Sequence, residues 1–170
     1  EMVRVFGGAR DRGEELITTV DYVADGFVQV LDHAADRDVL LLLETHDDWC
    51  ASAPVRAVVE QVGHANLKVL WDFMHSQRML EKPEESFQIL GEYTHHTHAH
   101  DGQIFDGKLQ VRGTLGSGLF DHEIPLRLLS EAGYSGYFSV EVIHKPGSEH
   151  NAEAVLAQYA EQFQAIMAGF

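Results

Sequence analysis

Four histidines and an aspartate lie within nine residues of this chain, Tyr93–Asp101, whose sequence is YTHHTHAHD. Side chains alternate between the two faces of a β-strand, so His96, His98 and His100 would share one face. A strand that ends in histidine and aspartate is typical of a metal or proton-transfer site. The alternative is a polar surface strand whose histidines occur by chance. Spacing within one segment does not decide between them.

Three carboxylates elsewhere in the chain follow the same pattern. Glu44, Asp72 and Glu141 each come at or near the end of a short apolar run and precede a loop or helix. In a parallel sheet these ends lie at one edge, and in a closed (β/α) barrel they converge at its carboxyl mouth. Together with His98 they would form a hard, anionic pocket. That set favours Mn²⁺, Mg²⁺ or Co²⁺ over thiolate-rich zinc sites, with Zn²⁺ still open.

Each of these residues also has a simpler interpretation when it is taken alone. A glutamate at a strand end is most often a solvated rim residue, and a lone histidine is most often satisfied by hydrogen bonds. One such residue at each of several strand ends is harder to explain by chance. The sequence therefore predicts that they act together.

The elements that would position these side chains alternate along the chain. Apolar and β-branched runs predict strands, at residues 2–6, 39–43, 67–71, 93–98 and 135–143. Apolar residues at three- and four-residue spacing predict helices, at residues 12–36, 52–62, 83–90 and 121–133 and from residue 151. This order predicts an α/β fold with a parallel sheet and crossover helices. Residues 101–118 are glycine-rich and predict a long loop with at most one short strand, mobile and beside the pocket.

Composition narrows the class of protein further. The chain has 170 residues, 45% of them hydrophobic, which predicts a single domain over 1–170 with a sizeable core. Its formal net charge of −15 repels phosphate backbones and argues against nucleic-acid binding. No apolar run reaches the length of a membrane span. The single cysteine, Cys50, fits a reducing compartment, so we expect a cytoplasmic protein.

Five segments, taken in order and spacing, resemble the xylose isomerase-like superfamily of TIM barrels, which includes sugar phosphate isomerases, epimerases and AP endonucleases. These segments are LLLETHDDW, VLWDFMHS, YTHHTHAHD, TLGSGLFDH and GYSGYFSVEVIH. The resemblance covers the whole chain and implies a (β/α)8 barrel, which takes about 250 residues. It assigns the first strand here to barrel strand three, so the first two βα units would be lacking. We therefore expect an open, curved sheet of five or six mainly parallel strands, completed by a longer polypeptide or by a second chain.

The resemblance also implies roles for particular residues. The divalent-metal ligands would be Glu44, Asp72, His98 and Glu141, with Glu44 and Glu141 also forming the acid/base pair. The substrate-binding residues would be His46, His75, His100 and Asp101.

Two positions depart from the pattern of ketose epimerases in the superfamily. Those enzymes carry a glutamate six residues beyond the one that matches Glu44, and this chain has Cys50 there. They also carry an arginine six residues beyond the histidine that matches His98, and this chain has Ile104. Both positions help to define the sugar site, so the pattern does not specify a ketose 3-epimerase.

The function that follows is metal-assisted proton transfer next to a carbonyl, in an isomerase or epimerase of a small carbohydrate, sugar phosphate or keto-cyclitol. Dehydration of a keto-cyclitol needs the same first step, so lyase activity stays open. Two alternatives remain: a metal-binding barrel fragment without turnover, and an AP endonuclease-like phosphodiesterase, which the net charge disfavours. We expect no nucleic-acid or membrane partner, and either a homo-oligomer or a longer chain that completes the barrel.

Overall fold

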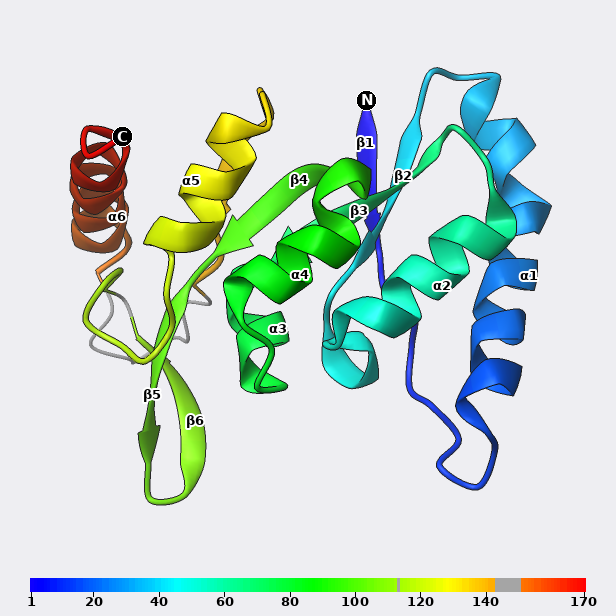
Figure 1. Cartoon of the computed structure of the whole chain (residues 1–170), viewed down its shortest axis with the longest axis horizontal. Coiled ribbons are helices and arrows are strands. Elements are labelled where there is room, and N and C mark those ends of the chain that lie inside the picture. The colour runs from blue at the N-terminus through cyan, green and yellow to red at the C-terminus, as the bar shows by residue number, and fades with distance from the viewer. Residues whose placement is uncertain (113, 143–150) are drawn as a thin grey trace.

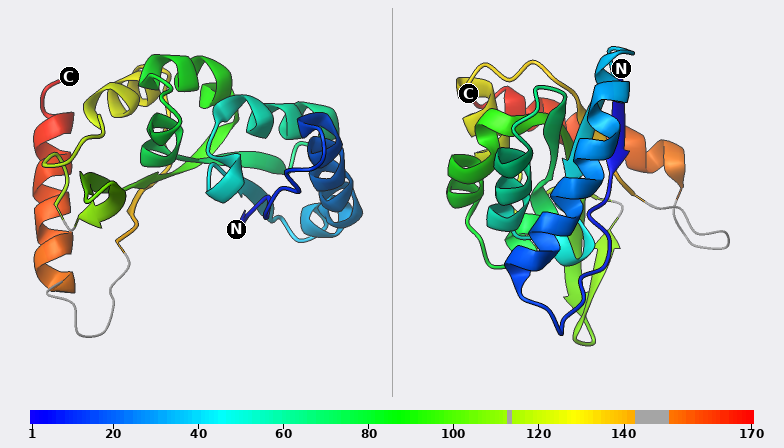
Figure 2. Two further views of the ribbon diagram at one scale, coloured as in Figure 1. Left: turned by 90° about the horizontal axis from the view of Figure 1, so that it is seen from below. Right: turned by 90° about the vertical axis from the view of Figure 1, so that its right-hand side faces the viewer.

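A computed structural model describes residues 1–112, 114–142 and 151–170. Its main sheet has five strands in the order β1-β2-β3-β4-β7, and all neighbours are parallel (Figure 1). The strands are β1 (Met2–Val5), β2 (Leu40–Glu44), β3 (Leu67–Asp72), β4 (Thr94–Ala99) and β7 (Phe138–Val140). The sheet curls into part of a barrel (Figure 2), which confirms the predicted α/β class and the open parallel sheet.

Helices follow the strands and lie along the outer, convex side of the curved sheet (Figure 2). The long ones are α1 (Leu16–Ala35), α2 (Ser52–Val62), α4 (Pro83–Leu90), α5 (Glu123–Glu131) and α6 (Ala152–Met167). Three short helical segments complete the set, namely α3 (Phe73–Arg78) and the 3-10 turns η1 (Asp47–Trp49) and η2 (Gly91–Tyr93). Within the described ranges, no helix is both long and apolar enough to cross a membrane.

Alternation along the strands sorts side chains between a core and a functional face. On β2 and β3, Leu43 and Trp71 point to the convex side of the sheet, into the core that α1 and α2 cover. Burying each such side chain contributes roughly 1.5–3 kcal/mol. The next residue in each strand, Glu44 and Asp72, therefore points to the concave side of the sheet. The apolar runs fix which face each acidic residue takes.

Residues 101–112 differ from the predicted loop. They form an antiparallel hairpin of β5 (Asp101–Phe105) and β6 (Lys108–Arg112). Its turn, Asp106-Gly107, has positive φ at both residues, the requirement of a tight hairpin turn that Asp-Gly meets. The prediction of a long loop is wrong because Asp-Gly between two strand-forming runs favours a tight hairpin. The hairpin extends past the carboxyl edge of the main sheet (Figure 1).

The last strand is also shorter than predicted. The sequence predicts a strand over 135–143, whereas β7 covers Phe138–Val140 and Ile143 lies outside the described residues. Glu141 follows β7 directly, and its backbone N–H donates to the carbonyl of Ala99 at 3.2 Å. This bond extends the alignment of β7 with β4 and carries Glu141 to the same edge as His98.

Candidate metal centre

The four predicted metal ligands meet at the carboxyl edge of the sheet. Glu44 ends β2, Asp72 ends β3 and pairs in register with His98 of β4, and Glu141 follows β7. One ligand atom from each lies within 4.8 Å of those of the other three. Residues up to 97 positions apart in the chain thus form one cluster, because parallel strands bring their carboxyl ends together.

His98 links the two glutamates of this cluster. Its Nδ1 lies 2.8 Å from Oε1 of Glu44 and 2.9 Å from Oε2 of Glu141. Burial alone would lower the pKa of His98, but the hydrogen bonds with Glu141 and Glu44 raise this pKa to about 9. The same hydrogen bond from His98, followed by one from Arg4, holds the pKa of Glu141 far below its usual range.

Arg4 is a member of this cluster that the sequence did not single out. Its Nη1 donates to Oε1 of Glu141 at 2.8 Å, and its Nε lies 3.5 Å from Oε2 of Glu44. The guanidinium also stacks over the ring of Phe6, 4.7 Å from its centroid. Alternation in the strand MVRVF could have placed Arg4 on the concave face, because Val5 packs against the core. Arg4 and protonated His98 supply the positive charge that three carboxylates require.

Basic side chains lie beside three buried carboxylate oxygens of the cluster. Oε2 of Glu44 lies 3.5 Å from Nε of Arg4, Oδ2 of Asp72 lies 2.8 Å from Nε2 of His100, and Oε2 of Glu141 lies 2.9 Å from Nδ1 of His98. Buried carboxylates that lie this close to one another are costly in free energy unless cationic groups offset their charge. Divalent cations bind such oxygens together with an imidazole nitrogen. The residues present therefore fit a divalent metal ion.

Hydrogen bonds to both its side chain and its backbone hold Asp72 in place. Its Oδ1 accepts from the backbone N–H groups of Met74 at 3.0 Å and His75 at 3.1 Å, so it caps helix α3. Its own N–H donates to Oγ1 of Thr45 at 2.8 Å. Capping the helix engages Oδ1 of the carboxylate, and Oδ2 points into the cluster.

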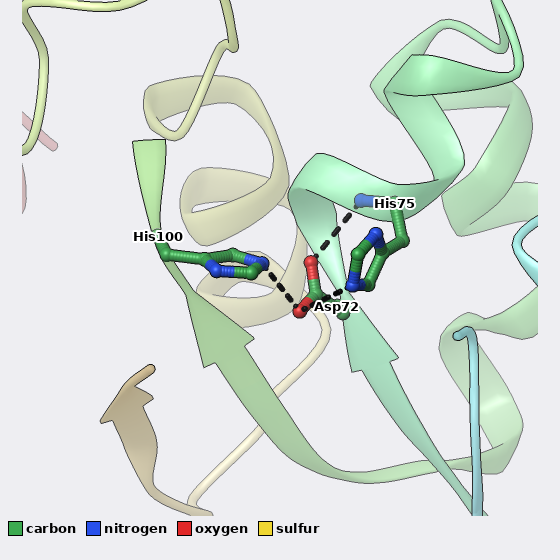
Figure 3. Close-up of side chains that lie close together, drawn as sticks. All are labelled: Asp72, His75 and His100. Atoms are coloured by element: carbon green, nitrogen blue, oxygen red, sulfur yellow. Dashed lines mark hydrogen bonds and ion pairs between the residues drawn. The ribbon is translucent and has the colours of Figure 1, made fainter. Parts of the chain in front are cut away.

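A wall of imidazoles borders the centre and contains three of the predicted substrate-binding residues. His46, His75 and His100 pack edge to face, with ring centroids 4.6 and 5.2 Å apart. Nε2 of His100 lies 2.8 Å from Oδ2 of Asp72, and Nε2 of His75 lies 3.8 Å from that oxygen (Figure 3). Burial lowers the pKa of His75 to about 4. The geometry places these three side chains beside the centre, and their contact with substrate stays a prediction.

Removal of the Arg4 charge should strengthen cation binding. Arg4→Met should bind Mn²⁺ about fivefold more tightly, because a half-exposed positive charge beside two ligands repels the cation by roughly 1 kcal/mol. Arg4→Lys keeps the charge and should bind Mn²⁺ like the wild type. Calorimetric titration of the metal-free proteins measures both affinities. Weaker binding by Arg4→Met would mean that Arg4 chiefly orients Glu141.

Comparison with known proteins shows the family to which the chain belongs. A sequence profile described as Xylose isomerase-like TIM barrel matches residues 1–165. The chain belongs to this family. No curated protein sequence matches the chain.

Solved structures of this family share the fold. An IolI protein with a bound zinc atom superposes with a TM-score of 0.84 at 19% identity, covering 100% of this chain and 64% of that one. A D-tagatose 3-epimerase-like protein gives 0.77 at 20% identity, covering 99% and 62%. The probable 3-DHS dehydratase AsbF from Bacillus anthracis gives 0.76 at 19% identity, covering 95% and 63%. The chain thus spans less than two thirds of the length of these xylose isomerase-like proteins.

Asp101, the fourth predicted substrate-binding residue, has another environment in this xylose isomerase-like fold. Its carboxylate is fully buried and accepts from the backbone N–H groups of Gly102, Gly116, Gly118 and Phe120. A side chain at position 118 would collide with this carboxylate, which explains the second glycine of the segment TLGSGLFDH. Both oxygens are committed to the backbone, so we assign Asp101 to holding the loop after the hairpin.

Loss of this carboxylate should destabilise the fold. Asp101→Ala should lower the free energy of unfolding by about 3 kcal/mol, because several backbone N–H groups would lose a charged acceptor. Asp25→Ala, on the exposed face of α1, removes the same side chain where it accepts no hydrogen bond from a described residue, and should change stability by less than about 0.5 kcal/mol. Urea unfolding measures both. Equal stabilities of the two variants would contradict the assignment.

Proposed function

We propose that this chain carries the metal centre of an isomerase or epimerase that moves a proton next to the carbonyl of a small carbohydrate, sugar phosphate or keto-cyclitol. The observation that carries the proposal is the cluster of Glu44, Asp72, His98 and Glu141, whose ligand atoms lie within 4.8 Å of one another and fit a divalent cation. The proposed cation is Mn²⁺, with Mg²⁺, Co²⁺ and Zn²⁺ as the other candidates.

The cation would polarise the substrate carbonyl and so lower the pKa of the neighbouring C–H. One of Glu44 and Glu141 would accept that proton as general base. The other would deliver a proton to the opposite face of the same carbon, in an epimerase, or to the neighbouring carbon, in an isomerase. Two carboxylates that reach the site from β2 and from the end of β7 suit delivery from opposite sides.

Other residues would orient the substrate. The imidazole wall of His46, His75 and His100 offers ring nitrogens to hydroxyl and carbonyl oxygens. Nε2 of His75 is buried and makes no hydrogen bond within the described part of the chain, so it is free to meet a polar ligand atom. An oxygen-rich substrate fits such a wall better than an apolar one.

The family supports the proposal only at the level of its fold. The similar solved structures include an epimerase-like protein and a probable dehydratase. A dehydratase of a keto-cyclitol would begin with the same removal of a proton beside a carbonyl. The net charge of −15 gives no support to a nuclease.

Proton exchange with solvent tests the proposal directly. The protein, loaded with Mn²⁺, would be incubated in D₂O with ketoses, hydroxypyruvate and inososes. We expect at least one compound to gain deuterium at the carbon beside its carbonyl. Proton NMR measures this as the loss of the signal of that C–H group. Turnover that leaves that carbon untouched, with a different bond broken, would contradict the proposed reaction.

A further inference from the structure

The two ring nitrogens of His75 face opposite surroundings. Nε2 is buried, lies toward Asp72 and makes no hydrogen bond with the residues that the structure describes. Nδ1 lies on the other side, 3.1 Å from Nη1 of Arg78, which is three residues further along α3. The side chain of His75 is only 6% exposed, whereas Arg78 is exposed at the rim.

The contact with Arg78 determines where the proton of His75 must be. A guanidinium has only N–H donors and stays protonated in proteins. Nδ1 of His75 must therefore accept with its lone pair, and the one proton of the neutral ring must be on Nε2. The nitrogen that points into the pocket is then an N–H donor.

This tautomer bears on a second group of possible metal ligands. The ligand atoms of Asp72, His75 and His100 lie within 4.8 Å of one another, close enough to hold a cation (Figure 3). A metal on Nε2 of His75 needs the lone pair of that nitrogen. Histidines that bind metals usually donate their other N–H to a carboxylate or a carbonyl. Here the other nitrogen faces a donor, which is the opposite arrangement.

We propose that Arg78 is a positioning residue that fixes His75 as the Nε2–H tautomer, so that His75 donates a hydrogen bond to a substrate oxygen and does not bind a second cation. This inference rests on the proposed function for the identity of the ligand. The acceptor would be a carbonyl or hydroxyl oxygen beside Asp72. A donor at this place would favour substrates on whose oxygen negative charge develops as the C–H proton leaves.

Nitrogen NMR of histidine tests the tautomer without any substrate. In ¹⁵N-histidine-labelled, metal-free protein, long-range proton–nitrogen spectra distinguish the two neutral tautomers, and His75→Asn assigns the signal. We expect the Nε2–H form in the wild type and a shift toward a mixture in Arg78→Met. Arg78→Lys, which also only donates, should restore the Nε2–H form. An Nδ1–H ring in the wild type, or no change in Arg78→Met, would overturn the inference.

Metal stoichiometry and kinetics supply a second, independent readout. Equilibrium dialysis with Mn²⁺ should give one tightly bound equivalent in the wild type. With a substrate found in the exchange screen, Arg78→Met should lose about tenfold in kcat/KM, and Arg78→Lys should recover most of it. Arg127→Met, at a half-exposed arginine of α5, is the matched control and should leave kcat/KM unchanged. A second tight Mn²⁺ equivalent that His75→Asn abolishes would overturn the inference.

These measurements separate the two proposals. The tautomer and the metal count are defined even if no carbohydrate is turned over, so they test Arg78 and His75 alone. An inactive protein with the expected tautomer and one bound Mn²⁺ would refute the proposed function and leave the assignment of His75 standing.

Discussion

Glu44→Gln should reduce turnover by about 10³-fold or more, because it removes one of the two carboxylates that exchange the proton. Glutamine has nearly the shape of glutamate, and its amide oxygen can still face the cation. Mn²⁺ should therefore still bind, although more weakly, and turnover should fall even when the variant is saturated with metal. Steady-state kinetics at saturating Mn²⁺ on the substrate found by deuterium exchange measures the loss.

The matched control for this substitution is Glu84→Gln, at an exposed glutamate in the first turn of α4. It removes one negative charge away from the centre and should leave turnover unchanged. Wild-type turnover in Glu44→Gln with metal bound would show that the carboxylate of Glu44 takes no part in proton transfer.

His98→Ala should lower the affinity for Mn²⁺ by about 100-fold or more, because it removes the proposed nitrogen ligand of the centre. The imidazole also links Glu44 and Glu141 at 2.8 and 2.9 Å, so its loss leaves the two carboxylates to repel each other. Elemental analysis after gel filtration and calorimetric titration both report the change.

His96→Ala is an unusually close control for this variant. His96 lies two residues earlier on β4, and its ring packs 5.8 Å from that of His98. Its Nε2 lies 2.8 Å from Oγ of Ser139, and it is not among the grouped ligands. His96→Ala should retain Mn²⁺ with an affinity within about threefold of the wild type, since only interactions outside the centre change. Equal losses in both variants would mean that the metal does not bind at His98.

The meeting of the four proposed ligand side chains at one edge of the sheet could be predicted because it depends on simple patterns. A buried apolar run determines which residues of a strand face the core, and the strand end determines where the next polar residue emerges. Leu43 before Glu44 and Trp71 before Asp72 follow this rule directly. The parallel order of the strands then brings the ends together.

The histidine-rich strand β4 shows what such patterns cannot predict. Alternation predicts one shared face for His96, His98 and His100, but each meets a different partner. His96 bonds to Ser139, His98 joins the glutamates, and His100 lies against Asp72. These partners come from other strands, and the register between β3 and β4 shifts at Val69/Leu70. Spacing within one segment cannot reveal that register.

The same limit applies to Arg4 and Asp101. Arg4 reaches Glu141, which is 137 residues away in the chain, and Asp101 holds backbone groups as far on as Phe120. Whether a charged side chain faces a ligand or its own backbone depends on how a distant loop returns. The segment after the hairpin folds back onto Asp101 through Gly116 and Gly118, a path that its glycines permit but do not specify.

The proposed function depends on the binding of a divalent cation by Glu44, Asp72, His98 and Glu141 together. Anomalous X-ray diffraction at the manganese edge, from crystals of the protein grown with Mn²⁺, locates that cation. We predict an anomalous peak among these four side chains, about 2.0–2.3 Å from their carboxylate oxygens and from the imidazole nitrogen of His98. A Mn²⁺-saturated protein whose anomalous peaks all lie away from these residues would contradict it.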